Sequence, residues 1–222
     1  MTILDKYKKY KKINTIIANI GPFKAPITIT VCSILRKENL GKNEVYENIK
    51  PYDVFNNAGF NINVSSSYIL ITNKAVKDPR KPNMPLSVCI YPRDFHSIIK
   101  LFDDKIFEWF YDEKYLDLYT YDADDNILQV NENKYNKLGL SITIKGLQNE
   151  KLGIKPAVVE CDDGRYKGIR LTTSVAHMVF LTIDELKELK NCLNNTINNF
   201  YNIVLNSINV SMGYSIMDSE EK

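Results

Sequence analysis

Glycine and histidine are scarce in this chain of 222 residues, which holds nine glycines and two histidines. Neither G-x-x-x-x-G-K-[ST] nor G-x-G-x-x-G occurs, so the sequence lacks the glycine-rich loops that cradle phosphate groups. Pairing Cys161 with His177 would give a nucleophile and a base with no third residue to orient them. We therefore expect a protein that is not an enzyme and that needs no cofactor.

Closely spaced cysteines and long apolar runs are also missing. Cys32, Cys89, Cys161 and Cys192 form no C-x-x-C pair, which argues against a zinc ribbon or a redox dithiol. We expect them to pack as small apolar side chains in a reducing compartment. No apolar run approaches the roughly 20 residues that cross a bilayer, and no signal peptide is recognisable. The sequence therefore predicts a cytoplasmic protein without a membrane partner.

The acidic residues give no good metal site. Asp122, Asp124 and Asn126 imitate the first ligands of a calcium loop, but Ile127 and Asn133 stand where glycine and glutamate are needed. The carboxylates between 103 and 113 fall on or just after an expected helix, away from its apolar stripe. We interpret them as a solvated face rather than a metal-dependent nuclease site, and we predict no metal.

Positive charge is present but uneven. The net charge of +2 excludes a uniformly basic surface. Residues 1–50 hold ten Lys and Arg against four Asp and Glu, whereas residues 100–125 hold three against nine. Such a distribution indicates faces of opposite sign.

Two stretches have the spacing of amphipathic helices. One apolar stripe runs from Phe95 through Ile98, Phe102 and Ile106 to Trp109, and a second runs from Leu186 to Val204. The two stripes coincide at an offset of 91 residues. Pro92 suits the first turn of the earlier helix, and Thr182 with Glu185 predicts a capping box at the start of the later one.

Alternating apolar and polar residues predict β-strands ahead of each helix. They lie at 27–31, 60–64, 68–71 and 86–90 in the first half, and at 116–118, 140–144, 157–159, 169–173 and 178–181 in the second. The sequence therefore predicts an α+β fold with two repeats of an antiparallel four- to five-stranded sheet followed by one helix. We expect a basic N-terminal arm and lead-in at 1–24, repeats at 25–113 and 114–206, and an acidic C-terminal tail at 207–222.

Lysine and tyrosine are interleaved at the start of the sequence, in KYKKYKK. Lysines neutralise phosphates, and tyrosine rings stack on unpaired bases, which contributes roughly 1–3 kcal/mol per base. Two further basic groups fall in expected strand connections. The candidate nucleic-acid-binding residues are Lys6, Tyr7, Lys8, Lys9, Tyr10, Lys11, Lys12, Lys74, Lys77, Arg80, Lys81, Arg165, Tyr166, Lys167 and Arg170.

Alternation on the expected strand at 169–173 places Arg170 and Thr172 opposite the apolar residues, and we predict that they face an open side of the sheet. The lysine-rich start has a second interpretation, because such termini are often solvated, disordered tails. Binding to an anionic membrane is a weaker alternative, since the N-terminal arm lacks a bulky apolar face.

The order of elements and the stretch KGIRLTTSVAHMVFLTIDELKELKNCL resemble the Whirly and PUR families of single-stranded nucleic-acid-binding proteins and phage-type relatives. The resemblance covers roughly residues 25–205. It implies a curved antiparallel sheet against a long helix, with basic and aromatic residues of the sheet face holding unpaired DNA or RNA. The lysine-rich motif typical of plant Whirly proteins is missing, and the nearest stretch is 167–171.

We therefore expect a viral protein of the host-cell cytoplasm that binds single strands with little sequence preference, in replication, recombination or transcription, and that associates with itself. Its tail is similar in kind to the acidic C-termini by which single-strand binders recruit partners, which implies contact with replication or transcription proteins. The competing interpretation is a non-enzymatic viral structural or adaptor protein that binds a protein partner.

The acidic tail predicts competition with nucleic acid for the basic N-terminal arm, because opposite charges attract. Removing residues 218–222 is expected to tighten binding to labelled oligo-dT at low salt, measured by gel shift. The same titration at high salt is the control, since salt screens exposed charges. Unchanged affinity at low salt would contradict this expectation.

Overall fold

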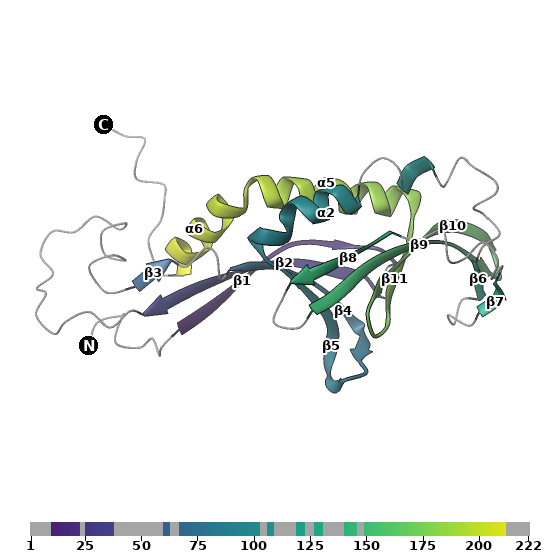
Figure 1. Cartoon of the computed structure of the whole chain (residues 1–222), viewed down its shortest axis with the longest axis horizontal. Helices are drawn as coiled ribbons and strands as arrows, with labels where there is room; N and C mark the ends of the chain where they lie inside the picture. Colours follow the sequence, from purple (N-terminus) through teal and green to yellow (C-terminus); the bar gives the residue numbers. More distant parts are fainter. Residues whose placement is uncertain are drawn as a thin grey trace, which may run out of the picture.

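Two β-sheets and a layer of helices make up the protein (Figure 1). The computed structural model describes residues 10–22, 25–37, 60–62, 67–102, 106–108, 119–122, 127–130, 140–145 and 149–211. In Figure 1 the helices lie along one side, and a hairpin of the first sheet projects from the other.

The first sheet has strand order β1-β2-β4-β5, with the short β3 beside β2, and every pairing is antiparallel. A 3-10 helix, η3, and a two-turn helix, α2, follow it in the chain. The bounds are β1 Tyr10–Ile20, β2 Ile27–Lys37, β3 Phe60–Ile62, β4 Tyr68–Asp78, β5 Lys81–Ile90, η3 Pro92–Asp94 and α2 Phe95–Leu101.

The second sheet has strand order β11-β10-β9-β6-β7, with β8 beside β9. Its pairings are antiparallel except that β6 runs parallel to β9. Two consecutive helices, α5 and α6, follow it. The bounds are β6 Tyr119–Asp122, β7 Ile127–Val130, β8 Leu140–Lys145, β9 Asn149–Cys161, β10 Gly164–Thr173, β11 His177–Thr182, α5 Ile183–Asn198 and α6 Phe200–Ser211.

The predicted α+β class with antiparallel sheets is confirmed. In chain order, η3 and α2 follow the first sheet, and α5 and α6 follow the second. One correction concerns the start of the chain. Residues 10–20, which we expected in a basic arm and lead-in, form the edge strand β1 of the first sheet.

Both apolar stripes are largely buried, as their spacing predicts. Ile98, Phe102 and Ile106 are buried in the first stripe, and the second is buried at Leu186, Leu189, Leu193, Phe200 and Val204. Trp109 lies outside the described residues. The first expected helix is interrupted, since α2 ends at Leu101 and residues 106–108 are helical again, and the second is divided at Asn199.

The predicted capping box at the start of α5 is present. Glu185 accepts a hydrogen bond from the Thr182 amide at 2.8 Å, and the Thr182 hydroxyl accepts one from the Glu185 amide at 3.5 Å. Two otherwise unpaired amide donors are thereby satisfied. Among the described helices, none combines the length and the apolar character that crossing a bilayer requires.

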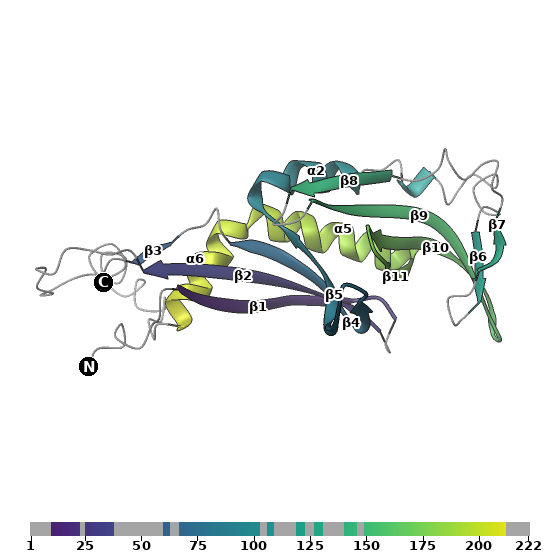
Figure 2. The ribbon, with the colours of Figure 1, turned by 60° about the horizontal axis from the view of Figure 1, so that its bottom comes forward.

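The two halves share one core. Helix α6, which follows the second sheet, packs on β1 and β2 of the first sheet, and α5 packs on β1 as well as on β10 and β11 (Figure 2). Conversely, α2 packs against β8 of the second sheet. The buried residues of both sheets and all three helices form a single apolar cluster. Each sheet therefore depends on a helix from the other half to bury its apolar face.

Asn73 joins the two sheets where β4 leaves the core. Its side-chain amide donates to the Met178 carbonyl of β11 at 2.7 Å and to the Ala25 carbonyl at 3.3 Å. Its side-chain oxygen accepts a hydrogen bond from the Ala75 amide at 2.8 Å. A buried amide with these partners is well satisfied and fixes three segments together.

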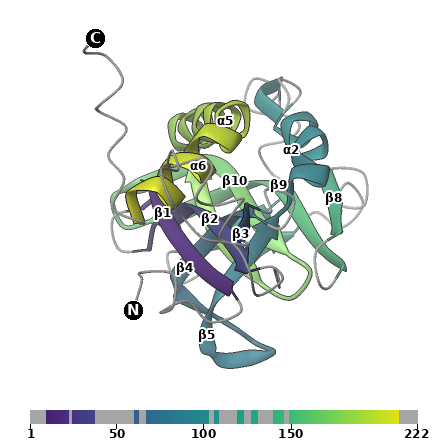
Figure 3. The ribbon, with the colours of Figure 1, turned by 90° about the vertical axis from the view of Figure 1, so that its left-hand side faces the viewer.

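Beyond Asn73, β4 and β5 continue as a two-stranded hairpin that projects away from the helices (Figure 3). We call residues 74–84 the ribbon. Most of its side chains are exposed, including Met84 at 56%. Pro82 and Pro85 lie in β5, which is an edge strand of the first sheet, the usual place for proline in a sheet.

Gly168 in β10 sits where a side chain would not fit. A Cβ at this position would lie 2.5 Å from Cζ of Phe180 and would also collide with the Leu181 carbonyl of the neighbouring strand β11. The Phe180 ring covers the glycine, so the two strands approach closely there. The carbonyl belongs to the backbone and cannot turn aside.

Gly168→Ala is therefore expected to destabilise the fold by about 1–3 kcal/mol, the usual cost of forcing an extra methyl group into a packed site. Urea unfolding followed by circular dichroism measures this difference. Ser174→Ala, which changes an exposed side chain after β10, is the control and should leave stability unchanged. Equal stability of the two variants would show that the strands separate at no cost.

Candidate nucleic-acid interface

The structure brings only some of the predicted binding residues together. Lys6, Tyr7, Lys8 and Lys9 lie outside the described residues. Tyr10 and Lys11 belong to strand β1, whose Lys12 is exposed. The KYKKYKK stretch thus ends inside a sheet.

The first basic group gathers on the ribbon. Lys74, Lys77, Arg80 and Lys81 are all exposed there. Arg80 makes a bidentate ion pair with Asp78, with Nε–Oδ1 at 3.0 Å and Nη2–Oδ2 at 2.9 Å. The Arg80 amide also donates to Asp78 Oδ1 at 2.9 Å. Arg80 therefore braces the turn, and the three lysines provide the ribbon's outward positive charge.

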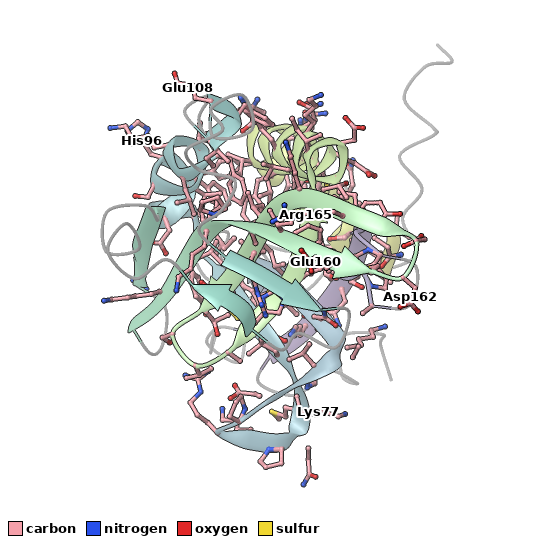
Figure 4. All side chains as sticks on the ribbon, turned by 90° about the vertical axis from the view of Figure 1, so that its right-hand side faces the viewer. Lys77, His96, Glu108, Glu160, Asp162 and Arg165 are labelled. Carbon is pink, nitrogen blue, oxygen red and sulfur yellow. The ribbon has the colours of Figure 1, made fainter. Side chains whose placement is uncertain are left out.

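The second basic group lies elsewhere, on the β9–β10 hairpin. Figure 4 shows Arg165 beside Glu160 and well apart from Lys77. Arg165 pairs with Glu160 at 3.4 Å, and the Tyr166 hydroxyl donates to Asp163 at 3.0 Å. Acidic residues therefore surround this hairpin, which makes it a poorer partner for phosphate than the ribbon.

The residues of this second basic group point to opposite faces of β10. Arg165 and Lys167 point to one face of β10, whereas Tyr166 and Arg170 point to the other. Arg170 differs from the exposed position that we expected, because it is only 6% exposed and its Nε donates to His177 Nδ1 at 3.0 Å. These residues do not share one surface, and we leave them out of the interface proposed below.

A different surface, on the first sheet, combines aromatic and basic residues. Ser33 of β2 hydrogen-bonds Ser207 of α6 at 2.6 Å, so the face that carries Ser33 is the one covered by helices. Neighbouring residues along a strand point to opposite faces. Cys32 and its cross-strand neighbour Tyr68 therefore lie on the other face, which we call the open face. The described helices all pack on the opposite side (Figure 1).

Two tyrosines meet on the open face. Tyr68 begins β4 and Tyr91 directly follows β5, and the pairing of Ile69 with Ile90 sets them opposite each other. Their ring centroids are 5.2 Å apart with the planes inclined at 44°. Both rings are half-buried, so each is fixed by its neighbours while part of its surface reaches solvent.

A cation lies over each ring. Lys12 Nζ is 5.1 Å from the Tyr68 ring centroid, and the Arg93 guanidinium carbon is 5.4 Å from that of Tyr91. The Arg93 side chain is 59% exposed. Lys12, Tyr68, Tyr91 and Arg93 therefore form a row that we call the tyrosine row, with a cation at each end.

The protonation states of this row favour an anionic ligand. Burial raises the pKa of the Tyr68 and Tyr91 phenols, so both remain uncharged at neutral pH. Burial alone would lower the pKa of Lys12, but its hydrogen bond with Tyr68 and the nearby Cys32 raise it overall. The row therefore carries two positive charges and no phenolate that would repel a phosphate, and the Asp94 carboxylate, with Oδ2 3.8 Å from Arg93 Nε, offsets part of the Arg93 charge.

Other chemistry finds little support on this face. Burial raises the pKa of the Cys32 thiol, which keeps it protonated and weakly nucleophilic. Cys32 is buried, as we expected of all four cysteines, whereas Cys89, Cys161 and Cys192 are half-buried. Within the described part of the chain, no three His, Cys, Asp or Glu side chains gather as a metal site would require.

Sequence reasoning missed Tyr68, Tyr91 and Arg93. A usable signal was present, since Tyr68 and Tyr91 are equally distant from the turn at Pro79–Arg80 and a hairpin centred there sets them opposite each other.

Comparison of the chain with family models, with curated proteins and with solved structures finds no match.

The Asp78–Arg80 pair at the ribbon turn predicts a pH dependence. Hydrogen bonds from the Arg80 side chain hold the pKa of Asp78 below its ordinary value of 3.8. The stabilisation of the turn is therefore present above that value and is lost as the pH falls through the lower folded pKa. An NMR titration of the Asp78 carboxyl should show this depressed midpoint.

Arg80→Ala is the control for that titration. Removing the guanidinium should raise the midpoint toward the ordinary value, with the backbone hydrogen bond retaining part of the shift. A midpoint that does not respond to this substitution would mean that the ion pair does not form in solution.

Proposed function

We propose that this chain is a non-enzymatic, sequence-tolerant binder of single-stranded DNA or RNA with a Whirly/PUR-like arrangement of its two sheet-and-helix units. The tyrosine row on the open face of the first sheet is the observation that carries the proposal. Paired aromatic rings flanked by cations are the combination with which proteins hold unpaired bases and their phosphates. The two rings lie on the face opposite the helices, where part of each ring reaches solvent.

Base stacking on the two tyrosine rings is worth more than the cation–π contacts that it would replace. A cation over an exposed ring contributes about 0.5–1 kcal/mol. Stacking of a base contributes roughly 1–3 kcal/mol. Lys12 and Arg93 are exposed, long side chains, so they can move from ring to phosphate while bases occupy the rings. Each cation then gains a charge-assisted contact with phosphate, in exchange for the Tyr68 hydrogen bond of Lys12 and the Asp94 ion pair of Arg93.

Hydrogen bonding on the open face supports sequence tolerance. Thr72 and Ser87 bond each other at 3.1 Å, and the Thr28 hydroxyl donates to Asn19 at 2.8 Å. These side chains already have partners within the sheet, so they are poorly placed to read base edges. Stacking and charge, which remain, differ little from one base to another.

Such a protein would protect or present single strands during replication, recombination or transcription. We propose a viral protein of this type, whose acidic tail contacts replication or transcription proteins. Self-association belongs to the same proposal.

Tyr91→Leu tests the proposal directly. The substitution keeps an apolar side chain but removes one stacking surface, so it should weaken binding by roughly 1–3 kcal/mol, or about 5- to 150-fold in Kd. Fluorescence anisotropy with labelled oligo-dT and with oligo-U measures this change. Arg93→Gln should weaken binding as well and should lower the dependence on salt.

Tyr201→Leu is the matched control, because Tyr201 is a tyrosine of α6 that is 61% exposed. It should bind like the wild type. Equal losses for Tyr91→Leu and Tyr201→Leu would remove the tyrosine row from the proposal. If the wild-type chain bound neither oligonucleotide at low salt, the adaptor interpretation would take its place.

A further inference from the structure

The ribbon has the charge of a phosphate-binding element. Lys74, Lys77 and Lys81 are exposed on it, and its single carboxylate, Asp78, is engaged by Arg80. The β9–β10 hairpin differs, because Glu160 and Asp163 contact its basic and aromatic side chains. Compared with the β9–β10 hairpin, the ribbon thus has the clearer excess of positive charge.

The ribbon is also preorganised. Asp78 Oδ1 accepts a hydrogen bond from the Arg80 amide, and Pro79 restricts the turn between them. Asn73 anchors the base of the ribbon through its bonds to Met178 and Ala75. An element fixed at both ends loses little conformational entropy when it binds a ligand.

The ribbon is carried by the same two strands as the open face, beyond a register shift in β4 between Asn73 and Lys77, and β5 gives the face of Lys77. Thr72 pairs with Ser87 on that face, and Lys77 pairs with Pro85, two residues before Ser87. Cross-strand partners share a face, and so do residues two apart. Lys77 therefore lies on the same side as Tyr68 and Tyr91. Pro85, the partner of Lys77, is six residues from Tyr91 along β5, which is about 20 Å at about 3.3 Å per residue.

We propose that the ribbon is a second subsite for the same nucleic-acid strand, one that binds phosphates alone through Lys74, Lys77 and Lys81. This inference rests on the function proposed above and adds a length requirement. A short oligonucleotide occupies the tyrosine row only, whereas a longer one continues along β4 and β5 onto the ribbon. The two subsites differ in chemistry, because the ribbon offers cations without aromatic rings.

The test compares two oligonucleotides, oligo-dT of about 4 and of about 16 nucleotides, which span the site sizes of comparable sheet proteins. Salt titrations by fluorescence anisotropy are made on the wild type and on the triple variant Lys74→Gln, Lys77→Gln, Lys81→Gln. A second triple variant, Lys100→Gln, Lys151→Gln, Lys187→Gln, removes the same charge from exposed positions outside the ribbon.

On the wild type, the longer oligonucleotide should show a steeper decrease of log affinity with log salt than the shorter one. The ribbon variant should lower the slope for the longer oligonucleotide by about 2, since each single-strand phosphate contact contributes about 0.7. Its affinity for the shorter one should be unchanged. The charge-matched variant should retain the wild-type slope for both.

Two results would overturn the inference while leaving the proposed function intact. In one, the ribbon variant binds the longer oligonucleotide with the wild-type slope. In the other, both triple variants lose equally, which would show that overall charge acts rather than the ribbon. Failure of the wild type to bind either oligonucleotide would instead refute the proposed function, and the inference with it.

Discussion

The mutual covering of the two sheets is the constraint on which the rest of the structure depends. Helices α5 and α6 follow the second sheet yet pack on β1 of the first, and α2 follows the first sheet yet packs against β8 of the second. A sheet with one apolar face is stable only when that face is covered. Neither half can therefore be removed without exposing the apolar face of the other, and the faces opposite the helices are left for solvent or a ligand.

Asn73 marks the boundary between the shared core and the ribbon. Before it, β4 alternates between the buried Ile69 and Ile71 and the half-buried Tyr68 and Leu70 of the open face, and ends with the buried Thr72. After it, β4 is mainly exposed and basic. Because the Asn73 amide holds β11 and the loop before β2 while its oxygen holds Ala75, the change from core to ribbon occurs within two residues. The tyrosine row and the ribbon lysines are thereby carried on the same pair of strands.

Local patterns predicted most of the fold because they report local constraints. The alternation at 27–31 and 86–90, the helical stripe from Leu186 to Val204 and the Thr182 capping box all reappear. Strand β1 was missed because an irregularity between Ile16 and Ala18 breaks its alternation, and its partners in β2 supply the pairing that the sequence does not show. Arg170 was misplaced for a related reason. Alternation predicts the face of a strand but not whether that face is covered. The tyrosine row required long-range register, since Tyr68 and Tyr91 meet only through the whole β4–β5 hairpin.

The two prolines of β5 affect how copies of the protein can associate when they bind side by side on one nucleic acid. An edge strand normally offers a line of amide hydrogens to which another chain can add. Pro82 and Pro85 have no amide hydrogen, so they weaken pairing of a second chain with this part of the edge of the sheet. Protein molecules bound side by side on one long nucleic acid would therefore not pair through β5, and each could dissociate without breaking contacts along β5 with the next molecule.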